Sequence, residues 1–321
     1  MNNNTPFSVA SLKSNLDIQH LVGLRGVSQA DIAKILETAN KFRSLLDEPN
    51  KHLPALHGLT IVNVFFENST RTRISFELAE KRLGADVVNF TSAGSSVEKG
   101  ETLLDTVRNI EAMKVDIAVV RHQSTGVPQF LAENTNAIIV NAGDGCHEHP
   151  TQALLDMLTI QRQLGSLEGK RIAIVGDILH SRVARSDIWG LKTMGAEVVL
   201  CGPPTLMPGN LSEFGVSSVT KLEDAVRNSD AIIALRLQKE RQQNGLLSSE
   251  REYRDIYGIT EDRIKDWNPN ALIMHPGPLN RNIELDSYVA DGLRSQILEQ
   301  VTNGVAVRMA VLFLLSGAKW S

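Results

Sequence analysis

The chain has 321 residues, of which 42% are hydrophobic and 22% are charged, and its formal net charge is −4. This composition is ordinary for a globular protein, the length suggests about two domains, and the charge gives no electrostatic reason to expect nucleic acid. No run approaches the roughly 20 apolar residues that span a bilayer, and the N-terminus lacks the pattern of a signal peptide. The two cysteines, Cys146 and Cys201, form no CxxC pair, so we expect a cytoplasmic protein without a membrane partner.

Two kinds of segment alternate along the chain after a polar start of about fifteen residues. Apolar runs rich in β-branched residues predict buried strands at Leu59–Phe66, Asp86–Phe90, Val115–Arg121, Ala137–Asn141, Arg171–Gly176, Glu197–Cys201, Ala231–Arg236 and Leu272–His275. Helical periodicity predicts helices at Thr72–Leu83, Glu101–Met113, Pro150–Leu164 and Arg182–Met194. Gly84 and Gly165 stand where helices often end in a left-handed residue.

This alternation predicts an α/β fold with two domains, each a mainly parallel sheet flanked by helices. We place the first domain at residues 1–148 and the second at 149–300, because a helix after His149 could lead from one sheet to the other. The apolar stretch Val301–Leu315 predicts a C-terminal helix, at about 301–321, that packs back onto the first domain. Ligands of open α/β sheets bind beyond the carboxyl ends of the strands, so we expect the active site in the cleft between the domains.

The strongest local signal is FFENSTRTR, at Phe65–Arg73, where a strand runs into a helix. The first turn of a helix has backbone N–H groups without intrahelical partners, and its dipole attracts anions. The side chains that could hold the same anion are Ser69, Thr70, Thr72, Arg71 and Arg73. The alternative is that Ser69 only caps the helix while both arginines lie in solvent.

The STRTR run at Ser69–Arg73 resembles the carbamoyl-phosphate signature of the aspartate/ornithine carbamoyltransferase family. His149-Pro150-Thr151-Gln152 is similar to the second signature of that family, and the resemblance extends from about residue 20 to the C-terminus. It implies that the first domain binds carbamoyl phosphate and the second binds the acceptor. It also implies that no metal and no organic cofactor is required.

The resemblance further implies how the first substrate is held. The binding residues would be Ser69, Thr70, Arg71, Thr72, Arg121, His149, Gln152, Gly277 and Pro278, and the catalytic ones Arg71, Thr72, Arg121 and His149. Arg121 would reach both phosphate and carbonyl oxygen, while His149 and Thr72 would polarise that carbonyl. Gln152 and the carbonyls of the His275–Pro278 turn would accept or orient the NH2 group, and Gly277–Pro278 would be a cis peptide.

Two alternatives concern these residues taken singly. Arg121 by itself could be a simple charge at a strand end. The run from Cys146 to His149 could suggest a metal site, but ligands so close in sequence seldom face one ion, and no distant cluster completes a tetrahedral set.

The second half of the chain indicates the acceptor. An ornithine enzyme of the family would be expected to carry an HCLP turn and an SMG loop, whereas His275–Pro278 reads HPGP and no SMG occurs. The segment Arg236–Arg241 resembles the aspartate-binding segment of the aspartate enzymes, and Arg182 matches a second arginine of that pocket. Two arginines can hold two carboxylates bidentately, so we expect aspartate as the acceptor, in a reaction of pyrimidine synthesis. The residues expected to bind it are Lys99, Arg182, Arg236 and Gln238.

The segment Gly94–Gly100 resembles a mobile loop that aspartate enzymes of the family borrow from a neighbouring subunit. Lys99 fits that pattern, and Ser96 is preferred over Ser95 as the loop serine, whereas Glu98 departs from relatives that are basic there. The resemblance therefore implies a homotrimer, with regulatory or dihydroorotase chains as further partners in some relatives. The alternative is a flexible Gly/Ser connector.

Two other functions would share parts of this pattern. A nicotinamide-dependent dehydrogenase would also place a strand before Gly176, but the segment Val175–Ser181 lacks GxGxxG. A non-catalytic scaffold member of the family would be expected to have degenerate motifs, whereas every phosphate and acceptor residue is present here.

Overall fold

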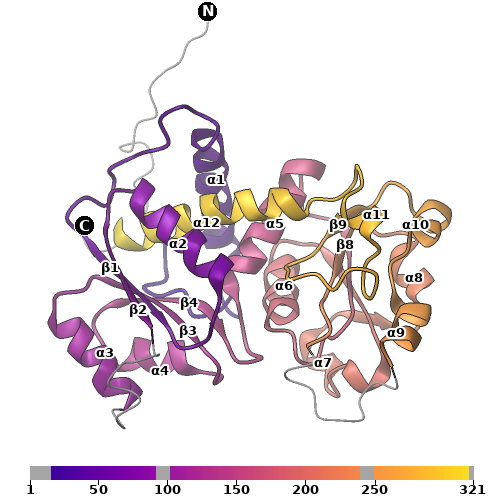
Figure 1. The fold of residues 1–321 in the computed structure, drawn as a ribbon, viewed down its shortest axis with the longest axis horizontal. Helices are drawn as coiled ribbons and strands as arrows, with labels where there is room; N and C mark the ends of the chain where they lie inside the picture. Colours follow the sequence, from indigo (N-terminus) through magenta and orange to yellow (C-terminus); the bar gives the residue numbers. More distant parts are fainter. Residues whose placement is uncertain (1–15, 92–101, 239–248, 318–321) are drawn as a thin grey trace, which may run out of the picture.

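The computed structural model describes residues 16–91, 102–238 and 249–317. Two parallel sheets lie side by side, each with helices on its faces (Figure 1). The first sheet has the order β2-β1-β3-β4 and contains β1 (Thr60–Phe65), β2 (Asp86–Thr91), β3 (Ile117–His122) and β4 (Ile138–Asp144). The second has the order β7-β6-β5-β8-β9 and contains β5 (Arg171–Val175), β6 (Glu197–Cys201), β7 (Ser217–Val219), β8 (Ala231–Ala234) and β9 (Leu272–Met274). The predicted fold class is confirmed.

The helices surround both sheets. Those around the first are α1 (Gln29–Leu45), α2 (Thr70–Arg82), α3 (Leu103–Ala112) and α4 (Val127–Asn134). The connecting helix is α5 (Pro150–Leu164), and the second half contains α6 (Arg182–Thr193), α7 (Leu211–Phe214), α8 (Leu222–Val226), α9 (Glu250–Tyr257), α10 (Glu261–Trp267) and α11 (Ser287–Ala290). The last helix is α12 (Ile297–Gly317). Central strands such as β1 are buried along almost their whole length, because helices cover both faces of a parallel sheet.

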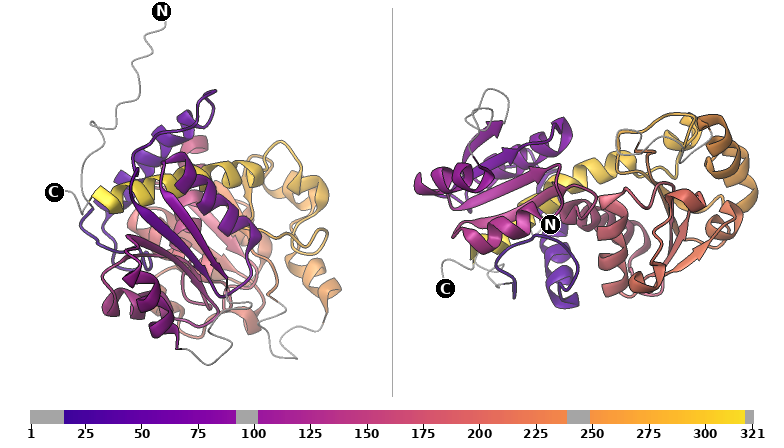
Figure 2. Two further views of the ribbon diagram at one scale, coloured as in Figure 1. Left: turned by 60° about the vertical axis from the view of Figure 1, so that its left-hand side comes forward. Right: turned by 90° about the horizontal axis from the view of Figure 1, so that it is seen from below.

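The C-terminal helix α12 returns to the first half of the molecule. It packs against α1, α2 and α5, and Figure 2 shows it lying across the body of the molecule. Phe42 of α1 and Phe313 of α12 meet edge to face, with ring centroids 5.8 Å apart. By length and composition alone α12 could cross a membrane, but 72% of its apolar window is buried inside the protein. The division at residues 148/149 stays a prediction, because α5 packs against α1, α6 and α12 together.

Each sheet has a point where the chain leaves a central strand towards opposite sides. In the first sheet β1 is flanked by β2 and β3, and in the second β5 is flanked by β6 and β8. The crevice beyond the carboxyl ends of strands at such a switch point is where open α/β sheets bind ligands. The fold therefore directs attention to the residues that follow β1 and β3, and to those that follow β5 and β8.

Candidate active site

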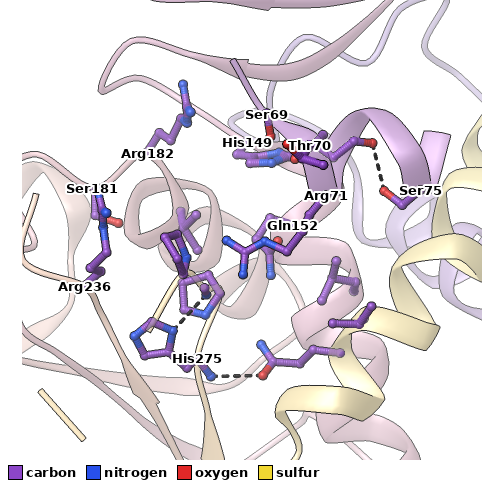
Figure 3. A pocket seen from close by; sticks show the side chains of 18 of the residues that line it. Ser69, Thr70, Arg71, Ser75, His149, Gln152, Ser181, Arg182, Arg236 and His275 are labelled. Atoms are coloured by element: carbon purple, nitrogen blue, oxygen red, sulfur yellow. Dashed lines mark hydrogen bonds between the residues drawn. The ribbon is translucent and has the colours of Figure 1, made fainter. Parts of the chain in front are cut away.

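A cavity of about 520 Å³ lies where these strand ends meet (Figure 3). Among the described residues that line it are a single acidic residue, Glu67, and five arginines: Arg71, Arg121, Arg182, Arg236 and Arg308. The arginines come from both halves of the chain, so the cavity joins the two sheets. Such an excess of positive charge in a concave site suits a small ligand, or a pair of ligands, with several negative charges.

The N-terminus of α2 forms one wall of the cavity. Ser69 is the N-cap residue in extended conformation, yet its side chain makes no capping hydrogen bond, so its hydroxyl remains available to a ligand. The first bond of this turn is donated by the N–H of Arg73 to the carbonyl of Ser69, at 3.2 Å. Ahead of it, the N–H groups of residues 70–72 find no acceptor in the described part of the chain. These donors and the helix dipole make the predicted anion cradle.

Arg71 extends from this helix across the cavity. Its guanidinium reaches the turn after β9 and lies against Gly277. A Cβ at position 277 would collide with it. The pKa of Arg71 is lowered, first by burial and then by the positive charge of Arg236 from the other half. An anion placed between the two arginines would relieve this repulsion. Arg73 does not line the cavity, so its expected part in phosphate binding finds no support.

Arg121 lies at the carboxyl end of β3, where the pairing with β4 shifts register between Val120 and His122. Such an irregularity turns a side chain out of the regular alternation. The side chain is buried, donating to the carbonyl of Ala142 at 3.1 Å and to Glu67 Oε1 at 3.0 Å. Arg121 is therefore a buried, hydrogen-bonded residue of the cavity wall, which the alternative of a simple charge at a strand end does not describe.

Glu67 joins the two halves of the site. It accepts two hydrogen bonds from Arg182, both at 2.9 Å, in addition to the one from Arg121. Charge-assisted forks of this kind hold geometry strongly. Glu67 was not among the predicted site residues, although an acidic residue placed next to an anion-binding motif is a signal present in the sequence.

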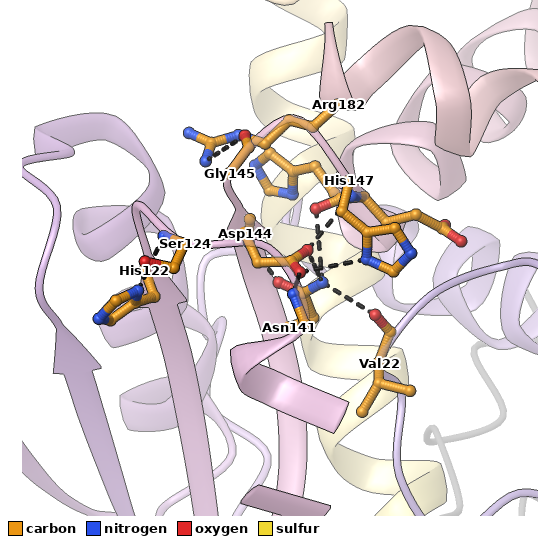
Figure 4. Close-up of polar contacts among 12 residues, drawn as sticks. Val22, His122, Ser124, Asn141, Asp144, Gly145, His147 and Arg182 are labelled. Carbon is orange, nitrogen blue, oxygen red and sulfur yellow. Dashed lines mark hydrogen bonds and ion pairs between the residues drawn. The ribbon is translucent and has the colours of Figure 1, made fainter. Parts of the chain in front are cut away.

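His149 is the N-cap residue of α5, and its N–H donates to Ser186 Oγ at 2.8 Å. The loop that leads to it is tied to β4 by Asp144 (Figure 4). The Asp144 carboxylate accepts from Asn141 Nδ2 at 2.7 Å and contacts His147 Nδ1 at 3.1 Å, which raises the pKa of His147. The His147 side chain therefore has a structural role in this loop, as the partner of Asp144.

The second half contributes three predicted residues after strand ends. Arg182 is the first residue of α6 and follows the N-cap Ser181, whose Oγ accepts from the N–H of Ala184 at 3.1 Å. Arg236 and Gln238 follow β8 and line the cavity, and the N–H of Gln238 donates to Asp177 Oδ2 at 3.4 Å.

The turn after β9 closes the cavity, and its Gly277–Pro278 peptide is cis, as predicted. The cavity brings together the predicted residues Ser69, Thr70, Arg71, Thr72, Arg121, His149, Gln152, Arg182, Arg236, Gln238, Gly277 and Pro278. Ser96 and Lys99 lie outside the described residues. Gln300 and Arg308 of α12 also line the cavity and were not predicted.

Comparison with known proteins agrees with this geometry. The carbamoyl-phosphate-binding domain model of the aspartate/ornithine carbamoyltransferases matches residues 19–162, and their Asp/Orn-binding domain model matches residues 168–315. The chain belongs to the aspartate/ornithine carbamoyltransferase family. The family resemblance seen in the sequence is thereby confirmed.

Curated members of the family are similar over nearly their whole length. An aspartate carbamoyltransferase catalytic subunit from Gemmatimonas aurantiaca is 58% identical over 93% of this chain and 94% of its own. One from Cytophaga hutchinsonii is 55% identical over 95% of this chain and 100% of its own. The solved aspartate transcarbamoylase of Trypanosoma cruzi, in complex with carbamoyl phosphate and aspartate, superposes with a TM-score of 0.83 at 32% identity, covering 96% of this chain and 98% of that one.

Proposed function

We propose that this chain transfers the carbamoyl group of carbamoyl phosphate to the α-amino group of L-aspartate. The products are N-carbamoyl-L-aspartate and phosphate, an early step of de novo pyrimidine biosynthesis. The observation that carries the proposal is a cavity lined both by the N-terminus of α2 and by Arg182 and Arg236 from the second half. The names of the curated relatives support it.

Carbamoyl phosphate would bind on the side of the first sheet. The phosphate would take the N–H groups of the first turn of α2, the hydroxyls of Ser69, Thr70 and Thr72, and the Arg71 guanidinium. Arg121 would bridge phosphate and carbonyl oxygen. Its position at the end of β3, buried at the cavity wall, suits it to this role. His149 would donate to the same carbonyl oxygen, and Gln152 would face the NH2 group.

Aspartate would bind on the side of the second sheet. Arg182 and Arg236, with Gln238, would hold its two carboxylates and leave the amine directed at the carbamoyl carbon. Glu67 now holds Arg182, so an incoming carboxylate would share or replace that contact. Ornithine would need a carboxylate for its side-chain amine, and the one acidic residue among the described lining residues already binds two arginines.

The reaction would be a direct displacement. The amine nitrogen forms a bond to the carbamoyl carbon and gives a tetrahedral oxyanion, and the bond from that carbon to the phosphate oxygen then breaks. Phosphate leaves with the bonding electron pair and takes the amine proton. Donors at the oxyanion, from Arg121, Thr72 and His149, are each worth roughly 3–4 kcal/mol when well placed. Alignment of the two substrates supplies much of the remaining acceleration.

An assay of carbamoyl transfer from carbamoyl phosphate to a panel of amino acids tests this function. We expect carbamoyl-aspartate to form, with little product from ornithine. A better rate with ornithine would contradict the assignment of the second half, and no product with any amino acid would favour the non-catalytic scaffold.

Arg236→Ala is expected to raise the KM for aspartate far more than that for carbamoyl phosphate. Loss of one charge-assisted fork to a carboxylate costs roughly 2–4 kcal/mol, which corresponds to about a 30- to 1,000-fold effect. Steady-state kinetics with each substrate varied in turn measure this. Arg227→Ala is the matched control, because Arg227 is half-exposed and pairs with Glu223 on the surface; equal changes in both KM values for Arg236→Ala would contradict the assignment.

We also propose that the chain works as a homotrimer in which Ser96 and Lys99 of one subunit complete the site of its neighbour. A ring of three copies makes such a contact through one repeated heterologous interface. The cytoplasmic location and any larger assembly with regulatory or dihydroorotase chains stay predictions from the sequence.

A further inference from the structure

Two carboxyl groups lie buried behind the cavity wall. Asp156 of α5 and Asp187 of α6 are both fully buried and interact side chain to side chain. Within the described residues, Asp156 Oδ2 and both oxygens of Asp187 have no other hydrogen-bond partner. Two ionised carboxylates in such a place would repel each other and lack solvation. One proton between them removes the repulsion and supplies the missing hydrogen bond.

The hydrogen bonds indicate which residue holds that proton. Burial raises the pKa of both carboxyl groups above the ordinary value, which favours one retained proton in the pair. Asp156 Oδ1 accepts from the amides of Gln152 and Gln300, whereas no described group donates to either oxygen of Asp187, so Asp187 is the acid and donates to the Asp156 carboxylate. The pair then carries a single negative charge.

That charge faces a buried cation from the last helix. Arg308 of α12 is buried at the wall of the cavity, and burial, followed by repulsion from Arg121, lowers its pKa to about 9. The charge of Asp156 opposes this lowering. With one proton shared, the pair Asp156 and Asp187 carries one negative charge near the single positive charge of Arg308. A second ionised carboxylate would not be balanced by that charge.

The same carboxylate orients two side-chain amides. Asp156 Oδ1 accepts from Gln152 Nε2 at 3.1 Å and from Gln300 Nε2 at 2.6 Å. Gln300 Oε1 in turn accepts from the N–H of His275 at 3.0 Å, which ties down the turn after β9. A carboxylate is only an acceptor, so it captures the NH2 end of each amide. Gln152, which lines the cavity, is left with its carbonyl oxygen for a ligand.

We propose that Asp156 and Asp187 share one proton, and that Asp156 thereby positions Gln152 as a hydrogen-bond acceptor for the NH2 group of the carbamoyl donor. This rests on the proposed function and adds a source of donor specificity. A site built to bond an N–H group rejects an analogue that lacks it. Acetyl phosphate, which has a methyl group in place of that NH2, should therefore bind more weakly than carbamoyl phosphate, and Asp156 is the positioning residue for this discrimination.

Binding measurements with carbamoyl phosphate, acetyl phosphate and inorganic phosphate test the proposal. Asp156→Leu should weaken carbamoyl phosphate roughly tenfold to a hundredfold, with little change for inorganic phosphate, and should erase the preference over acetyl phosphate. Asp187→Leu should have a smaller effect in the same direction. Asp187→Asn, unlike Asp187→Leu, should keep the wild-type preference for carbamoyl phosphate, because the asparagine amide can donate a hydrogen bond to Asp156 without a titrating proton. A preference that survives in a folded Asp156→Leu variant would overturn the positioning role.

Thr159→Val is the matched control. Thr159 lies one turn further along α5 and accepts from Asn303 Nδ2 of α12 at 2.9 Å, so the variant breaks a similar buried link between the same two helices. It should lower stability without changing the preference between the two acyl phosphates. Equal loss of preference in Thr159→Val would mean that helix packing alone is responsible.

Infrared spectroscopy tests the proton even if Asp156→Leu fails to fold. The wild-type protein at neutral pH should show a protonated carboxyl band that is lost in Asp187→Asn. Glu80, whose pKa burial raises to about 8, should contribute its own band in both proteins. A difference spectrum without a protonated carboxyl band would refute the shared proton. None of these measurements needs an acceptor, so a wild-type protein that binds carbamoyl phosphate but never carbamoylates aspartate would contradict the proposed function alone.

Discussion

Arg71→Ala is expected to abolish measurable carbamoyl transfer while leaving the fold intact. Arg71 reaches from α2 to the turn at Gly277, and its pKa is lowered first by burial and then by the charge of Arg236. In the free protein both effects disfavour the charge of this arginine, so its removal should not lower the melting temperature. With the donor bound, the same charge would hold the phosphate and oppose its growing negative charge, and its loss should cost at least about a thousandfold in kcat/KM.

The comparison that isolates this effect is Arg73→Ala. Arg73 belongs to the same helical turn but does not line the cavity. We expect that variant to keep near-normal transfer, measured as carbamoyl-aspartate formed under saturating aspartate. Near-normal activity in a well-folded Arg71→Ala protein would contradict the phosphate assignment, and equal losses in the two variants would point to the helix rather than to the guanidinium.

Strands and helices near the site were predictable where local chemistry determines them. The helix predicted at Pro150–Leu164 has those same bounds, since a proline begins it and Gly165, with φ of 82°, follows its end. By contrast β7 has three residues, none of them buried, so no apolar run marks it. Helix α1 was missed although Ser28 caps it by accepting from the N–H of Asp31, a pattern present in the sequence.

The site shows the same division between local and distant information. Residues 69–73 are neighbours in the chain, so their motif predicts a phosphate cradle directly. The bridge from Glu67 to Arg182 spans 115 residues, and the bond from Gln300 to Asp156 spans 144. Spacing alone does not indicate such partners, because the topology of two sheets and the return of α12 bring them together. Most residues that line the cavity could therefore be predicted from the sequence, but the distant contacts that hold them in position could not.

The proposed trimer predicts that two inactive variants recover activity when their subunits are mixed. Lys99→Ala should inactivate the protein as Arg71→Ala does, because each site would lack one of its cations. If Lys99 of one subunit completes the site built around Arg71 of the next, mixing the two inactive variants and reassembling them should restore activity. In a ring with random order, about a quarter of the sites would then pair an intact Arg71 with an intact Lys99. We expect roughly that share of wild-type activity per subunit.

A second mixture serves as the control. Arg71 and His149 line the cavity of a single chain, so Arg71→Ala mixed with His149→Ala leaves every site with one damaged residue. That mixture should stay inactive under the same exchange conditions, which mass spectrometry of differently labelled subunits would verify. Recovery in both mixtures would mean that reassembly itself repairs the protein. An inactive Arg71→Ala and Lys99→Ala mixture after verified exchange, or full activity in an isolated monomer, would rule out a site shared between subunits, because the proposed geometry requires Lys99 to come from a neighbour.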